Sequence, residues 1–146
     1  MALLHFDSTV VGRPASAAEA RGAVTALLAQ RPLVCDARTR DDILLVVSEL
    51  VGNSLHHGGR IALLKASLFP HAFDLTVTTA DGPPATGASA GCHPVPDGFG
   101  RPLVAGLAEV FTVTRPRSGG TRLRVQMSLH RPHQLPMHQY PQNRMG

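Results

Sequence analysis

The sequence lacks several features that define common protein classes. It contains no tryptophan, one tyrosine and two cysteines. No hydrophobic run approaches the ~20 residues of a membrane-spanning helix, and two cysteines are too few for a disulfide framework. The N-terminus has no basic region followed by an apolar core, so we expect no signal peptide. These absences argue against membrane and disulfide-stapled secreted proteins and favour a soluble, cytoplasmic one.

What the chain does have fits one globular domain. Its 146 residues are 43% hydrophobic and 16% charged, which is enough for one core and too little for two domains. Because aromatic residues are only 4% of the chain, leucine, valine and alanine must fill that core. The end of the chain is rich in proline, histidine and glutamine. We therefore expect a domain over residues 1–130 and a disordered tail over 131–146.

Positive charge is concentrated in the last third of the sequence. Thirteen of the fourteen cationic residues are arginines, and seven arginines follow residue 100 against one acid, Glu109. Such a patch suits an acidic protein, a nucleotide or a nucleic acid, or is simply a solvated basic surface. No basic run is interleaved with aromatics, so nucleic acid is the least favoured partner. Four of the arginines are close in sequence: Arg115, Arg117, Arg122 and Arg124.

Hydrophobic periodicity and capping residues predict the secondary structure. Ser16 and Glu19 form a capping box at the start of a helix, Thr39 or Asp41 starts a second helix, and Gly58-Gly59 ends it. The segment 81–98 is predicted as a functional or mobile loop. The predicted strands are 3–10, 61–68, 73–79, 110–114 and 121–129, and the predicted helices are 16–30, 40–57 and 101–109. This order favours an α+β two-layer sandwich, with helices on one face of a mixed, mostly antiparallel sheet.

The second helix carries the polar residues of greatest chemical interest. Glu49 and Asn53 are four residues apart and lie one above the other, opposite an apolar face that includes Val47 and Val51. Leu45 and Val46 flank Glu49, so we interpret this side as the wall of a pocket instead of a solvated face. A carboxylate can accept a proton from a hydroxyl group or water, and an amide oxygen suits Mg²⁺.

The segment from Glu49 to Gly58, E-L-V-x-N-x-x-x-H-G, resembles the N-box of the Bergerat-fold (GHKL) ATPases. It is most similar to the small bacterial anti-sigma-factor serine kinases of the RsbW and SpoIIAB type and their actinobacterial relatives. The resemblance implies that Glu49 is the general base, that Asn53 holds Mg²⁺ bridging the ATP phosphates, and that His57 lies beside the nucleotide. As an alternative, His57 only provides a cation at the helix C-terminus.

The resemblance also implies two glycine boxes. In the first, Asp81 or, in another register, Ala80 occupies the place of the adenine-binding aspartate, followed by Gly82. Strand alternation favours Asp81, although a plain Asp-Gly-Pro turn is the alternative. Pro83 and Pro84 depart from the family pattern, because they remove two backbone N–H groups.

The second box matches better. Gly98 and Gly100 let the backbone approach a phosphate at a helix start, where Arg101 replaces a usual leucine. Residues 82–97 correspond to the ATP lid. Gly119-Gly120-Thr121 matches a glycine-glycine-threonine turn that contacts the nucleotide, although a simple hairpin fits equally well.

The function that the resemblance implies is an ATP- and Mg²⁺-dependent anti-sigma factor. Such a protein binds a sigma factor and phosphorylates a serine or threonine of an anti-anti-sigma (STAS-type) partner, and it can form a homodimer. Because the first glycine box is altered, the alternative is a degenerate interaction module that no longer binds ATP. No membrane partner is expected.

Overall fold

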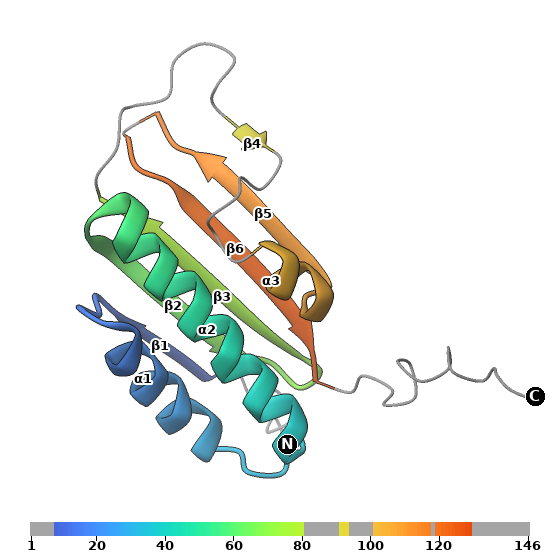
Figure 1. The fold of residues 1–146 in the computed structure, drawn as a ribbon. Helices are drawn as coiled ribbons and strands as arrows, with labels where there is room; N and C mark the ends of the chain where they lie inside the picture. Colours follow the sequence, from blue (N-terminus) through green and yellow to red (C-terminus); the bar gives the residue numbers. More distant parts are fainter. Residues whose placement is uncertain (1–7, 81–90, 94–100, 118, 130–146) are drawn as a thin grey trace, which may run out of the picture.

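The computed structural model describes residues 8–80, 91–93, 101–117 and 119–129 (Figure 1). The predicted tail and the domain boundary at residue 130 lie outside these residues. The helices and strands follow in the order β1 (Ser8–Gly12), α1 (Ala17–Ala29), α2 (Ala37–Gly58), β2 (Ile61–Leu68), β3 (Ala72–Thr79), β4 (Gly91–His93), α3 (Arg101–Leu107), β5 (Val110–Arg115) and β6 (Arg122–Ser128).

The strands form one six-stranded sheet in the order β1-β2-β3-β6-β5-β4. All five described pairings between neighbouring strands are antiparallel. The three helices lie on the same face of this sheet, with α1 against β1, α2 against β2 and β3, and α3 against β5 (Figure 1). The predicted α+β two-layer sandwich is therefore confirmed.

The core lies between the helices and the sheet and follows from strand alternation. Every second residue of β3, from Phe73 to Thr79, is buried, and β6 buries Leu123, Val125 and Met127 in the same way. Phe73 is the one aromatic side chain among the buried core residues that the structure describes. Leucine and valine fill most of the remaining space, as the scarcity of aromatics requires.

The capping box predicted for α1 is confirmed. The Glu19 amide donates to Ser16 Oγ at 3.1 Å, and Glu19 Oε1 in return accepts from the Ala15 amide at 3.0 Å. The return bond thus goes to the residue before the N-cap. Both bonds satisfy amides at a helix end that has no intrahelical acceptors for them.

The predicted start of α2 is wrong by several residues. Asp36, whose backbone is extended, is the N-cap, and its Oδ1 accepts from the Thr39 amide at 2.9 Å. Thr39 lies within the first turn and its side chain is 6% exposed, so it packs instead of capping. The apolar periodicity begins only at Ile43, which is why the sequence placed the start too late.

We expect Asp36→Ala to lower the free energy of unfolding by about 1 kcal/mol, because it removes the N-cap acceptor. Urea unfolding followed by circular dichroism would measure the change. Asp36→Asn keeps a capping oxygen and is expected to lose clearly less. An equal loss in both variants would show that the negative charge near the helix N-terminus, and not the hydrogen bond, is what stabilises.

The strand predicted over 3–10 corresponds to β1, which ends two residues later, at Gly12; residues 3–7 lie outside the described part of the chain. The remaining boundaries agree closely, with two differences. The predicted loop 81–98 contains the short strand β4, which pairs with β5. Its three residues, glycine, cysteine and histidine, are too few for any periodicity to reveal. The predicted helix 101–109 ends at Leu107, because Glu109 already donates its amide to Gln126 O at 2.8 Å beside the sheet. None of the described helices is both long and apolar enough to cross a membrane.

Candidate functional site

One side of helix α2 packs into the hydrophobic core. This packing sets the orientation of the opposite side, which carries Glu49 and Asn53. Val46, Val47, Leu50, Val51 and Ser54 are all 0% exposed. The apolar face predicted from the sequence is therefore confirmed for Val47 and Val51. Val46, predicted to flank Glu49 in a pocket wall, belongs to the core instead. The remaining side of the helix, which carries Glu49 and Asn53, is held in one orientation by this packing.

The side chains of Glu49 and Asn53 are hydrogen-bonded to each other and lie between the core and the surface. Asn53 Nδ2 donates to Glu49 Oε1 at 3.5 Å, and both residues are half-buried. The bond uses the N–H group of the amide, so Glu49 does not engage the carbonyl oxygen, which is the atom that would bind Mg²⁺. Of the apolar neighbours, Val46 is wholly buried and Leu45 is 44% exposed. An exposed leucine next to a half-buried carboxylate fits a ligand-facing surface.

Two serines on α2 add features that the sequence did not indicate. Ser54 is 0% exposed, and its hydroxyl has no hydrogen-bond partner in the structure. Such orphaned groups are rare in proteins, and a bound polar molecule or water can satisfy them. Ser48 accepts a hydrogen bond from Arg21 Nη1 at 3.0 Å. This bond ties α1 to α2 one residue before Glu49.

The ends of β3 and β6 are joined by three hydrogen bonds between two threonines. The Thr79 amide donates to Thr121 O at 2.8 Å, and the Thr121 amide donates to Thr79 Oγ1 at 2.9 Å. The Thr79 hydroxyl also donates to Thr121 O at 3.4 Å. Both threonines are buried, on the side of the sheet that the helices cover. Thr121, predicted as a site residue, is thus fixed to the end of β3.

A glycine makes this close approach possible. Gly120 has a φ of +80°, and a Cβ atom placed there would lie 2.1 Å from the carbonyl oxygen of Thr79. Gly119 also has a positive φ, of 104°. The two glycines are therefore required by backbone geometry, which the hairpin alternative explains without any ligand.

The end of β3 that carries Thr79 lies beside the C-terminal end of α2. The Ala80 amide, just after β3, donates to Arg60 O at 2.9 Å, just before β2. Because Arg60 follows the C-terminal end of α2, this bond brings the end of β3 beside the end of the helix (Figure 1). The structure thus places the Thr79–Thr121 junction beside the C-terminal end of the helix that carries Glu49 and Asn53.

Several predicted site residues are not placed by the structure. Asp81, Gly82, Gly98 and Gly100 lie outside the described residues, as do residues 82–90 and 94–97 of the predicted lid. His57 lies in the last turn of α2 and Arg101 is the first residue of α3, and only their backbone is described. Their roles remain predictions. Ala80, the alternative to Asp81, is exposed.

Three of the four clustered arginines are divided between two faces of the sheet. Arg122 and Arg124 alternate with the buried residues of β6 and lie on the outer face, whereas Arg115 follows Val113 by two and shares its helix-covered side. Arg124 donates to both carboxylate oxygens of Asp74 at 3.2 Å. These hydrogen bonds and the nearby negative charge raise the pKa of Arg124. Among the described residues, Arg115, Arg122 and Arg124 therefore do not form one continuous basic patch, which disfavours the nucleic-acid interpretation.

Comparison with known proteins adds one match. Residues 10–127 match the family model of the histidine kinase-like ATPase domain. This range covers most of the chain and includes every described helix and nearly every described strand residue. A search of curated proteins finds no match.

Proposed function

Because the chain belongs to the histidine kinase-like ATPase family, we propose that it is a cytoplasmic, ATP-binding anti-sigma factor with serine/threonine kinase activity. The observation that carries this proposal is the Glu49–Asn53 pair, half-buried and hydrogen-bonded on the free side of a helix whose other side is fixed in the core. The resemblance of the segment around this pair to anti-sigma-factor kinases supports the choice within the family.

The donor set at this end of the fold suits a nucleotide with Mg²⁺. Asn53 offers a neutral amide oxygen to the cation, and the carboxylate of Glu49 lies one helical turn away on the same side of α2. Bound Mg²⁺ would neutralise charge that develops on the transferred phosphate. Asp81, Gly82 and Thr121 would hold the base, whereas Gly98, Gly100 and Arg101 would border the phosphates and His57 the end of the helix.

Glu49 is the residue to which we assign proton transfer. The hydroxyl oxygen of a serine or threonine of the anti-anti-sigma (STAS-type) partner would attack the γ-phosphorus of ATP. The bond from that phosphorus to the leaving ADP oxygen breaks, and the hydroxyl proton passes to the Glu49 carboxylate. In its other state the protein would bind a sigma factor, with or without forming a homodimer.

Calorimetric titration of Mg·ATP into the purified protein tests the nucleotide part of the proposal. We expect micromolar affinity, about 8 kcal/mol of binding free energy. Incubation with γ-labelled ATP and a STAS-domain protein encoded near it then tests phosphoryl transfer. Binding without transfer would leave an ATP-dependent binding protein and reject the kinase.

A second candidate is a degenerate interaction module that has lost ATP. The observation in its favour is Pro83-Pro84 immediately after Asp81-Gly82, since prolines deprive the first glycine box of two amide donors. No heat and no thermal shift at millimolar Mg·ATP would select this candidate. The sigma factor and the STAS-type protein would then be tested as nucleotide-independent partners.

A further inference from the structure

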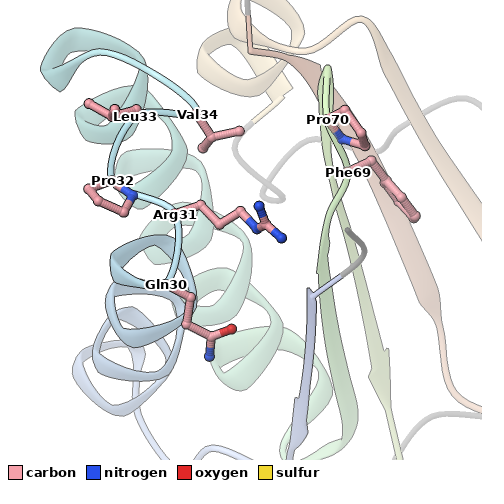
Figure 2. Close-up of a pocket in the computed structure, with 7 residues that line it drawn as sticks. All are labelled: Gln30, Arg31, Pro32, Leu33, Val34, Phe69 and Pro70. Carbon is pink, nitrogen blue, oxygen red and sulfur yellow. The ribbon is translucent and has the colours of Figure 1, made fainter. Parts of the chain in front are cut away.

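A groove of about 450 Å³ lies far from the polar pair, where the chain between α1 and α2 faces the turn between β2 and β3 (Figure 2). Residues 30–34 form one wall, and Phe69 and Pro70 form the other. The side chains of Arg31 and Val34 extend toward that turn, whereas Leu33 points away from it and is 95% exposed (Figure 2). Val34 also packs against the hydrophobic core. The groove therefore combines apolar surface, from Val34, Phe69 and Pro70, with the side chain of Arg31.

The described part of the chain starts at the edge of this groove. Ser8, the first residue of β1, pairs with Leu68, and Leu68 immediately precedes Phe69. The chain before Ser8 therefore leaves the sheet next to the groove.

The alternation of β1 indicates which preceding side chains face the helices. Ser8 and Val10 are half-buried, and Val10 packs against the core, whereas Thr9 and Val11 are exposed. Even-numbered residues of this strand thus face the helix layer. Residues 1–7 read Met-Ala-Leu-Leu-His-Phe-Asp, so the same alternation assigns Leu4 and Phe6 to the groove side.

We propose that residues 1–7 are the occupant of this groove, with Phe6 and Leu4 seated between Val34 and Pro70. The competing segment of the same chain is 130–146, because the Leu129 amide donates to His71 O at 3.1 Å and so ends β6 beside the same turn. That segment is rich in proline, histidine and glutamine, which suits an apolar groove less well than a run with two leucines and a phenylalanine. The proposal is independent of nucleotide binding.

Alanine substitutions in the full chain test the alternation. Phe6→Ala is expected to lower the midpoint of thermal unfolding by about 2–5 °C, since it removes buried apolar area from a domain of this size. His5→Ala, of opposite alternation, is the matched control and is expected to shift it by less than about 1 °C. In a Val34→Ala background, Phe6→Ala should lower the midpoint of thermal unfolding by less. The proposed contact between Phe6 and Val34 is then already removed by the first substitution. Equal shifts for Phe6→Ala and His5→Ala would overturn the proposal.

Nuclear Overhauser effects give a direct readout. With one tyrosine, five phenylalanines and no tryptophan, the aromatic spectrum is sparse, and Phe6→Leu would identify the Phe6 ring signals. We expect contacts from this ring to the Val34 methyl groups. Contacts to Val34 from residues 130–146 instead would assign the groove to the C-terminal segment. Contacts seen only between differently labelled molecules would assign it to a second copy, and either result would overturn the proposal.

Discussion

Gly120→Ala is expected to cost about 3 kcal/mol or more of the free energy of unfolding, a large share of the ~5–15 kcal/mol that holds a domain folded. The φ of +80° disfavours any side chain, and the new Cβ would lie 2.1 Å from a backbone oxygen. That oxygen belongs to Thr79, whose amide and hydroxyl are both bonded to Thr121. The Thr79 carbonyl oxygen therefore cannot move away from the new Cβ without breaking the hydrogen bonds that join β3 to β6.

Urea unfolding followed by far-ultraviolet circular dichroism would measure this loss, since the chain has no tryptophan to report by fluorescence. Gly22→Ala is the matched control. Gly22 lies within α1 with no atom within 4 Å of an added Cβ, so this change is expected to raise stability by about 0.5–1 kcal/mol. If Gly120→Ala proved as harmless as Gly22→Ala, the described close approach at Thr79 would be wrong.

Asn53→Ala is expected to weaken Mg·ATP binding about 100-fold, or ~2.7 kcal/mol, with little effect on folding. The fold should survive because Asn53 is half-buried on the free side of α2 and its hydrogen bond to Glu49 is long, at 3.5 Å. The loss should come from removal of the amide oxygen assigned to Mg²⁺. Calorimetric titration with Mg·ATP, alongside a thermal-unfolding measurement, would separate the two effects.

Two variants on the same helix complete this test. Glu49→Gln keeps the size of the side chain and is expected to bind Mg·ATP within a few-fold of the unaltered protein while phosphoryl transfer falls by about 10²–10⁴. Asp41→Asn removes a carboxylate at an exposed position of α2 and should change neither quantity. If Asn53→Ala bound Mg·ATP unchanged, the polar pair would not be the nucleotide site.

Most of the fold could be predicted because buried apolar residues recur along this sequence with the regular spacing of strands and helices. The alternation of β3 and β6 and the apolar stripe of α2 are local patterns, and they located the strands to within one or two residues. The start of α2 was missed because the helix is capped by the side chain of Asp36, whereas the apolar periodicity begins only at Ile43. Strand β4 was missed because its pairing with β5 is a long-range contact that three residues cannot encode.

The candidate site was less predictable, because its parts come from distant segments. The spacing of Glu49 and Asn53 was readable along one helix, whereas the bonds from Thr79 to Thr121 join residues 42 positions apart. The orphaned Ser54 hydroxyl depends on what surrounds it in three dimensions. On the sequence Ser54 is simply the next residue of an apolar face.

The position of β6 in the sheet determines when the sheet can be completed during synthesis of the chain. The last described strand of the chain lies at the centre of the sheet, between β3 and β5. In the described pairings, the ladder β1-β2-β3 and the ladder β4-β5 are connected only through it. During synthesis, which releases the N-terminal part first, the two groups of strands must wait with exposed edges until Arg122–Ser128 has emerged. A nascent chain halted before residue 122 would therefore present two unpaired edges to chaperones or to other nascent chains.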